Sequence, residues 1–199
     1  MSKFILPYDG KVKLTSGFGR RVLNGKDEYH FGIDLIGLNS KIVYSPCEGF
    51  IEMSNIVTDK TNKTWEWGNY IRIKADSETD IYLCHLAERF VVKGDYVLQG
   101  QPIGYEGDTG YTFGQHLHLE FRKNGKSFDP CELLGIKNKE GIYEGNVEKI
   151  NDWSIDAITW AIKYGILKGY SETEPDYKLD KPVTREEMLT FLYRLYKLL

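Results

Sequence analysis

The chain has few cysteines and no long apolar stretch. Its 199 residues include three cysteines, Cys47, Cys84 and Cys131, which are widely spaced and form no Cys-x-x-Cys pair. An odd number of scattered cysteines argues against a disulfide framework, so we expect reduced, mostly buried thiols that behave as small hydrophobic residues. No run approaches the roughly 18 apolar residues that a membrane-spanning helix needs. We therefore expect no membrane insertion.

The chain also lacks an excess of positive charge and a signal-peptide core. Its net charge is -3 and its pI is near 5.9, which argues against an electrostatic nucleic-acid binder. The first ten residues contain an apolar stretch that is too short for a signal peptide, and they have no small-residue cleavage site. The sequence therefore predicts a protein that is made, and at first held, in the cytoplasm.

The first two-thirds of the sequence has the pattern of a β protein. Short runs rich in β-branched and aromatic residues alternate with glycine-bearing turns, and no long stretch before residue 134 has helical periodicity. The runs span 12–16, 41–44, 49–56, 69–75, 81–85, 96–98 and 116–122. We predict a mainly β domain over residues 1–135, built from two sheets folded on each other.

The remaining residues predict a linker and a small helical module. Residues 136–149 are mostly polar and punctuated by glycine, which is typical of a linker. Residues 150–199 switch to a period of 3.6, with Asp152 as the candidate N-cap of a first helix and Gly165 at its end. A capping box, Thr184–Glu187, begins a second helix. Two helices in about fifty residues are marginal alone, so we expect packing on a partner or self-association.

All four histidines lie in settings that suit a metal site. His30 precedes Asp34 by four residues, His85 ends a predicted strand, and His116 and His118 lie in another. Side chains alternate along a strand, so His116 and His118 share a face. A catalytic zinc site keeps three protein ligands and leaves a position for water. We expect His30, Asp34 and one residue of the His-x-His pair as ligands, and geometry alone favours neither member of the pair.

The other histidines are candidates for acid–base catalysis. Zinc lowers the pKa of water and polarises a carbonyl group, and imidazole suits proton transfer near neutral pH. Strand alternation predicts that Leu117 and Leu119 face the core, and that Cys84 points away from the face that carries His85. That placement argues against a thiolate ligand.

Simpler interpretations compete with the metal site. A single His-x-His is weak evidence for metal binding, and structural zinc usually has four closed ligands that include cysteine. The glycines at positions 17, 19, 107 and 110 favour turns over phosphate cradles, because no helix follows them. The aromatic residues Trp65, Trp67, Tyr70 and Tyr111 fit a substrate groove and ordinary packing equally well. The ordered occurrence of all the histidine motifs, with no spare histidine, favours zinc.

Three motifs resemble the lysostaphin-type zinc endopeptidases of bacterial cell walls. They are His30-Phe-Gly-Ile-Asp34, Tyr82-Leu-Cys-His85-Leu86 and His116-Leu-His118. The resemblance covers roughly residues 10 to 133 and includes the segments 16–20, 42–49, 68–71, 92–97, 100–104 and 107–110. It implies a duplicated β-sheet hybrid motif. It further implies His30, Asp34 and His118 as zinc ligands, with His85 and His116 as catalytic residues.

The C-terminal module resembles a single S-layer homology unit. The matching text lies at Trp153, 156–161, 165–170 and 183–187. Such units commonly anchor proteins to secondary polymers of Gram-positive walls, usually as three copies. The resemblance therefore implies a wall polymer as a second partner, and self-association is one way to supply further copies.

Together these features predict a zinc metallo-endopeptidase that hydrolyses peptide bonds of peptidoglycan. The small size, the wall module and the missing export signal are typical of a phage or prophage endolysin that reaches the wall after release from the cytoplasm. A non-catalytic wall-binding or virion protein is the main alternative, and a morphogenesis or sporulation factor is a weaker one. The cleaved bond stays open between a glycine bridge, a D-alanyl bond and a diaminopimelate cross-link, with residues 57–67 as the expected selector.

Overall fold

The computed structural model describes residues 3–23, 25–62, 65–145 and 183–197, together with residues 147, 160, 161, 164 and 166. The chain divides into two compact units, Met1–Lys149 and Ile150–Leu199. The division into domains at residues 135 and 149 stays a prediction. Among the described residues, no helix is both long and apolar enough to cross a lipid bilayer.

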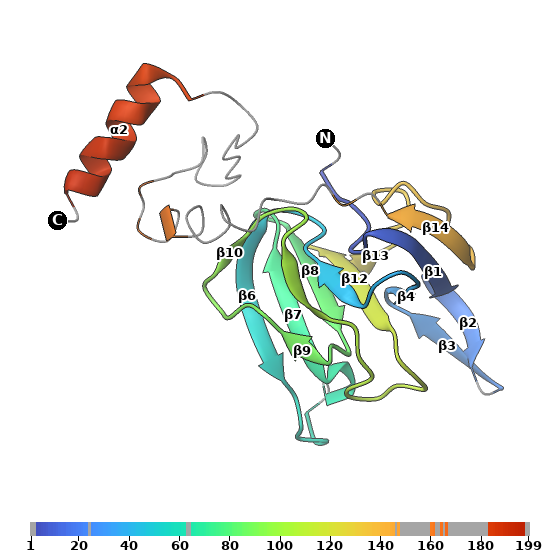
Figure 1. Ribbon diagram of the computed structural model, residues 1–199. Coiled ribbons are helices and arrows are strands. Elements are labelled where there is room, and N and C mark those ends of the chain that lie inside the picture. The colour runs from blue at the N-terminus through green and yellow to red at the C-terminus, as the bar shows by residue number, and fades with distance from the viewer. Residues whose placement is uncertain are drawn as a thin grey trace. The chain divides into compact units, whose positions relative to one another are not determined.

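A large antiparallel sheet forms the frame of the first unit (Figure 1). Its strands run in the order β10-β6-β7-β8-β12-β4-β1-β14, and β13 pairs with β12 beside this path. They span β1 Gly10–Ser16, β4 Ile33–Gly37, β6 Gly49–Ile56, β7 Asn69–Lys74, β8 Thr79–Cys84, β10 Tyr96–Val97, β12 Leu117–Lys123, β13 Lys126–Phe128 and β14 Gly141–Gly145.

Two smaller sheets complete this unit. One has the order β5-β11-β9, and the other is the β2-β3 hairpin. Their strands span β2 Gly19–Leu23, β3 Lys26–His30, β5 Ile42–Tyr44, β9 Glu88–Arg89 and β11 Pro102–Tyr105. Val43 and Ile103 of the three-stranded sheet are fully buried in one core cluster with Ile33, Leu83 and Leu119 of the large sheet. The predicted mainly β fold is confirmed, although the β2-β3 hairpin forms a third sheet beside the two that were predicted.

Strand β14 lies within the segment that was predicted to be a linker. It pairs antiparallel with β1, in the register Gly10 to Gly145 and Leu14 to Gly141. Tyr143 opposes Val12 and packs against the core, while Ile142 is exposed. The structure thus has a strand where the sequence predicts a linker. A short edge strand needs only backbone pairing and a few apolar contacts, so a polar, glycine-rich sequence can form one without showing the usual strand pattern.

The described part of the second unit contains helix α2, Arg185–Tyr196. The predicted capping box is confirmed: Thr184 Oγ1 accepts from the Glu187 backbone N–H at 3.1 Å, and Glu187 Oε2 accepts from the Thr184 N–H at 2.8 Å. The predicted first helix, with its cap at Asp152 and its end at Gly165, lies almost entirely outside the described residues.

Candidate metal centre

The turn between β3 and β4 places the first two candidate ligands. β3 ends at His30, and Asp34 is the second residue of β4. Gly32 lies between them, where a Cβ atom would come within 2.5 Å of the Leu119 carbonyl oxygen and 2.8 Å of His118 Cε1. Because glycine has no Cβ, this turn approaches β12 without a clash.

Strand pairing brings His118 to the same place. β12 runs antiparallel to β4, and His118 lies directly opposite Asp34. Residues directly opposite each other project from the same face of a sheet, so their side chains meet. Leu117 and Leu119 are fully buried on the other face. The predicted core position of these two leucines is therefore confirmed.

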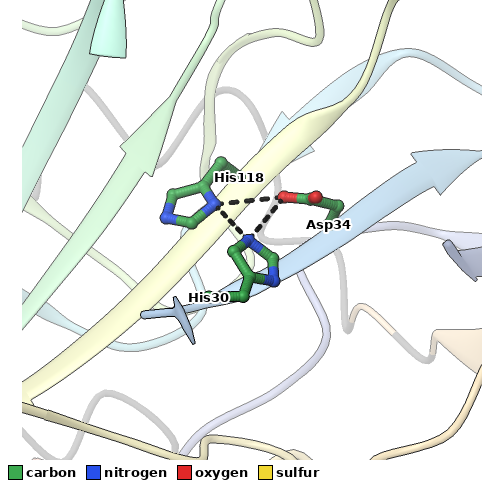
Figure 2. Close-up of side chains that lie close together, drawn as sticks. All are labelled: His30, Asp34 and His118. Atoms are coloured by element: carbon green, nitrogen blue, oxygen red, sulfur yellow. Dashed lines mark hydrogen bonds and ion pairs between the residues drawn. The ribbon is translucent and has the colours of Figure 1, made fainter. Parts of the chain in front are cut away.

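Three ligand-type atoms converge at this point (Figure 2). His118 Nδ1 lies 3.0 Å from both His30 Nε2 and Asp34 Oδ1, and His30 Nε2 lies 3.2 Å from Asp34 Oδ1. Ligands about 2.0 to 2.1 Å from a tetrahedral zinc ion are roughly 3.3 Å apart. The observed separations and the nitrogen–oxygen donor set fit such an ion.

Contacts on the far side of each imidazole ring indicate which nitrogen is available to a metal. His30 Nδ1–H donates to the Gly17 carbonyl oxygen at 2.8 Å, which leaves Nε2 as the free lone pair. His118 Nε2 faces Glu120 Oε2 at 3.8 Å, which leaves Nδ1 toward Asp34. Partners of this kind set the tautomer and the orientation of metal-binding histidines.

Arg21 holds the second oxygen of Asp34. Its Nη1 donates to Asp34 Oδ2 at 3.2 Å and to Ser16 Oγ at 2.7 Å, and its Nε pairs with Glu28. Oδ1 is therefore the oxygen that faces His30 and His118. The β2-β3 hairpin supplies both Arg21 and Glu28, so it orients the carboxylate from outside the cluster.

The electrostatics of the cluster favour a cation. Burial raises the pKa of Asp34, but hydrogen bonds and charge interactions with His118 and His30 outweigh burial and leave that pKa well below its ordinary value. Burial lowers the pKa of His118, but Asp34 and Glu120 raise it to about 9. A site that holds a proton this strongly offers the negative environment that a divalent ion needs.

His85 and His116 border the cluster. The ring centroids of His85 and His116 are 4.7 Å apart, and those of His85 and His118 are 5.9 Å apart. His85 Nδ1–H donates to the Thr109 carbonyl at 2.9 Å, and His116 Nδ1–H donates to the Gly114 carbonyl at 2.8 Å. The Nε2 atoms therefore carry the free lone pairs, and that of His116 lies 3.6 Å from Asp34 Oδ1.

His85 is neutral at physiological pH. Burial lowers its pKa, and the neighbouring His116 and His118 lower it further, to about 4. A neutral imidazole with a free Nε2 can accept a proton, which is the requirement for a general base. The structure thus brings all five predicted site residues together.

The predicted direction of Cys84 is wrong. Cys84 lies opposite His118 in the β8–β12 register and packs with Tyr70 and Tyr82, so its side chain lies on the same face as His118. Simple alternation fails because the next residue, His85, has a φ of 67°, in the left-handed region. Burial nevertheless raises the pKa of the Cys84 thiol well above its ordinary value, which argues against a thiolate.

The packing of the cysteines and of four aromatic residues distinguishes between the roles that the sequence left open for them. All three cysteines are free and buried, as predicted. Trp67 packs against Tyr70 and Tyr82, with centroids 5.2 and 5.1 Å away, so packing explains Trp67 and Tyr70. Trp65 contacts the half-exposed Tyr111 at 5.7 Å, and Tyr111 contacts Phe113 at 5.4 Å. This last group, Trp65, Tyr111 and Phe113, is here named the aromatic ledge.

Sequence reasoning missed the groups that orient the site. Three are backbone carbonyls, at Gly17, Thr109 and Gly114, which carry no side-chain signal. Arg21 and Glu120 were also missed. Glu120 offered a usable signal, because it continues the alternation of His116 and His118 onto the same strand face.

Known proteins resemble the first unit. The chain is 32% identical over 121 residues to the peptidoglycan DD-endopeptidase ShyC of Vibrio cholerae, covering 59% of this chain and 26% of that protein. It is 33% identical over 124 residues to lysostaphin of Staphylococcus staphylolyticus, covering 56% of this chain and 26% of that protein. The chain thus spans about a quarter of the length of these curated relatives.

Solved structures show the same fold. The catalytic domain of lysostaphin from Staphylococcus simulans has a TM-score of 0.52 at 29% identity, covering 63% of this chain and 91% of that one. A zinc-containing peptidase from Vibrio cholerae has a TM-score of 0.54 at 25% identity, covering 69% of this chain and 41% of that one.

The prediction of a cytoplasmic protein that reaches the wall only after release is wrong. Residues 147–189 match the S-layer homology domain, and relatives of the first unit are named as peptidoglycan endopeptidases. Both findings indicate an extracytoplasmic protein of the cell surface. The apolar stretch at the N-terminus was weak evidence for the location of the protein, because it tests for one kind of export signal only.

Residues 28–130 match the sequence profile of peptidase family M23, and this segment carries all five site residues. The match covers just over half of the chain. The chain therefore belongs to peptidase family M23.

Proposed function

We propose that the protein is a zinc-dependent endopeptidase that hydrolyses peptide bonds of bacterial peptidoglycan at the cell surface. The observation that carries this proposal is the convergence of His30 Nε2, Asp34 Oδ1 and His118 Nδ1 beside two further imidazole rings. His30, Asp34 and His118 are the proposed zinc ligands. Zinc held in this way supplies Lewis acidity and makes water a stronger acid.

The two remaining histidines divide the proton transfers. His85, which is neutral and has a free Nε2, is the proposed base that takes a proton from the attacking water. His116 also presents its Nε2 to the cluster; once this nitrogen has taken up a proton, the resulting imidazolium can stabilise the oxyanion or protonate the leaving amine. The carbonyls of Thr109 and Gly114 hold the Nδ1–H of both rings, so Nε2 is the nitrogen of each ring that can gain or lose a proton in the site.

Separate measurements of metal content and turnover test these roles. We expect one zinc per chain by elemental analysis, and release of new amine termini from purified peptidoglycan. His118→Ala should lose both the metal and the activity, whereas His85→Ala and His116→Ala should keep the metal and lose roughly 100-fold or more in turnover. Lys126→Gln, a change on β13 at the surface, is the matched control. Hydrolysis that persists in metal-free His118→Ala would refute the proposal.

The C-terminal unit is the proposed attachment to the wall. The S-layer homology match supports a secondary wall polymer as its ligand.

Helix α2 exposes an apolar stripe of Leu189, Leu192, Tyr193 and Tyr196, at spacings that place them on one face. We infer that this stripe supports self-association. Sedimentation velocity should show an oligomer that Leu192→Glu dissociates, and a monomer at all concentrations would contradict it.

A wall-clearing role like that of a phage or prophage endolysin is the alternative to limited hydrolysis at the cell surface. It is supported only by the combination of a catalytic unit with a wall-binding unit. An endolysin lowers the turbidity of a suspension of cell walls, whereas a surface hydrolase with limited action releases fragments and leaves the turbidity nearly unchanged. Turbidity and amine release, measured together on Gram-positive walls, distinguish these roles. Mass spectrometry of the fragments identifies the cleaved bond.

A further inference from the structure

Thr109 connects three segments of the chain at the edge of the site. Its hydroxyl oxygen accepts from the Asn69 backbone N–H at 2.9 Å and donates to the Leu86 carbonyl oxygen at 2.9 Å. Its own carbonyl accepts from His85 Nδ1–H at 2.9 Å. One residue thus links the start of β7, the chain just after β8 and the ring of His85.

The backbone of His85 needs such support because its conformation is unfavourable. Its φ of 67° lies in the left-handed region, which non-glycine residues rarely adopt. Its N–H donates to the Trp67 carbonyl at 2.9 Å, and the next N–H, of Leu86, donates to Asn69 at 3.0 Å. Contacts outside the residue therefore hold this conformation against its local cost.

The loop around Thr109 has little space in which to relax. A Cβ atom at Gly68 would lie 2.4 Å from the Thr109 carbonyl carbon, and one at Gly110 would lie 2.3 Å from the Glu66 carbonyl oxygen. The Tyr111 N–H also donates to Glu66 at 2.9 Å. Because two glycines allow this close packing, the position of the Thr109 carbonyl depends on the turn that also carries Trp67.

We propose that Thr109 is a positioning residue, whose hydroxyl holds its own carbonyl where it orients His85 toward the metal cluster. This inference rests on the proposed role of His85 as the base. The hydroxyl is the required group, because it satisfies a donor at Asn69 and an acceptor at Leu86 at once. Valine has the same shape but leaves both backbone groups without this partner, whereas serine keeps the hydroxyl.

The kinetic test compares Thr109→Val with Thr109→Ser. Thr109→Val should lower kcat roughly tenfold to a hundredfold, because small displacements of a catalytic group have effects of that size, while KM changes less than about twofold. Thr109→Ser should restore most of kcat. The matched control is Thr112→Val, in the same loop, whose hydroxyl donates to Asp108 at 3.2 Å and is not linked to His85. Rates are normalised to the folded fraction measured by circular dichroism.

A spectroscopic readout separates positioning from catalysis. Long-range proton–nitrogen correlation spectra of the zinc-loaded protein should show His85 as the Nδ1–H tautomer in the wild type. Thr109→Val should shift or split that signal, whereas Thr112→Val should not. An unchanged His85 signal with unchanged kcat would overturn the inference. A shifted signal with full activity would support the positioning and instead contradict the catalytic role of His85.

Discussion

Gly32 lies against the imidazole ring of His118, and this contact leaves no space for even one methyl group. The glycine belongs to the turn that carries His30 and Asp34, and the histidine belongs to a strand more than eighty residues later in the sequence. The third candidate ligand is therefore positioned by the turn that supplies the first two.

Gly32→Ala should weaken metal binding. The added Cβ would clash with the Leu119 carbonyl oxygen and with the His118 ring, so the turn and β12 must move apart, and we expect zinc affinity to fall roughly 10-fold to 100-fold, the usual range when the support of a ligand is disturbed. Competition with a fluorescent chelator measures this affinity. Gly141→Ala is the matched control, because its nearest neighbour is an ordinary contact with Tyr143 at 3.6 Å. Equal affinities in the two variants would contradict the role of Gly32.

Glu106 is expected to be a major source of stability for the first unit, Met1–Lys149. Its buried carboxylate accepts from Tyr8 Oη at 2.7 Å, from the Gly37 N–H at 2.8 Å and from Lys41 Nζ at 2.6 Å. Glu106→Gln places an amide donor among these donors, so we expect a loss of about 1 to 3 kcal/mol in the free energy of unfolding.

Tyr8→Phe tests the same hydrogen bonds by removing one donor to Glu106. It should lower the free energy of unfolding by about 1 to 2 kcal/mol, because one buried carboxylate oxygen loses a donor. Urea denaturation measures both variants. Tyr143→Phe is the control, because its hydroxyl donates only to backbone carbonyls of Lys137 and Lys139 near the surface. Unfolding midpoints that match the wild type in both network variants would show that the buried carboxylate adds no net stability.

Acid should remove the contribution that Asp76, in the turn between β7 and β8, makes to the free energy of unfolding. Burial alone would raise the pKa of Asp76, but hydrogen bonds from Lys3 and from the backbone N–H groups of Glu78 and Thr79 lower it to about 2. The folded pKa is thus below the unfolded one, so the folded state binds fewer protons. The contribution is complete above about pH 4 and is lost as the pH falls toward about 2.

Asp76→Asn checks this pH dependence. The gap in unfolding free energy between wild type and variant should be large at pH 6 and should shrink at pH 3, as urea denaturation at both values would reveal. Ser77→Ala, in the same turn, should show an equal gap at both pH values. A gap for Asp76→Asn that stays constant with pH would contradict the assignment.

The aromatic ledge is expected to contribute to substrate binding. Phe113 is 66% exposed and Tyr111 is 53% exposed, and the chain between them and His116 carries the Gly114 carbonyl that orients that histidine. Phe113→Ala should raise KM several-fold with little change in kcat, because an exposed ring stabilises bound substrate and transition state alike. Phe90→Ala, an exposed ring on another part of the unit, is the control. A fall in kcat at constant KM would contradict a binding role.

The residues of the candidate site could be chosen from the sequence because their spacing is typical of metal ligands. The four-residue step from His30 to Asp34 and the alternation at His116 and His118 are local patterns. Neither pattern contains Gly17, Thr109 or Gly114, since their contribution is a backbone carbonyl, which every residue type possesses. Cys84 was misplaced for a related reason: the left-handed φ of His85 depends on the Trp67 and Thr109 contacts, which are distant in the sequence.

The main strands of the fold were predictable from apolar runs, whereas its edges were not. Strand β12 has fully buried residues at every second position, which is a strong signal. Strands β2 and β3 pair only with each other, and His30 is the only buried residue among their ten, so their polar sequences resemble a loop. Strand β14 is similar, because only its pairing with β1 distinguishes it from a flexible connection.

That pairing has a practical consequence for anyone who truncates the protein. A fragment that stops at residue 135 would lack β14, and the backbone N–H and C=O groups along one side of β1 would have no partner strand. Exposed edge strands pair with strands of other chains, so such a fragment is prone to aggregate. Strand β1 also pairs with β4, the strand of Asp34, so the damage would begin one strand away from a proposed zinc ligand.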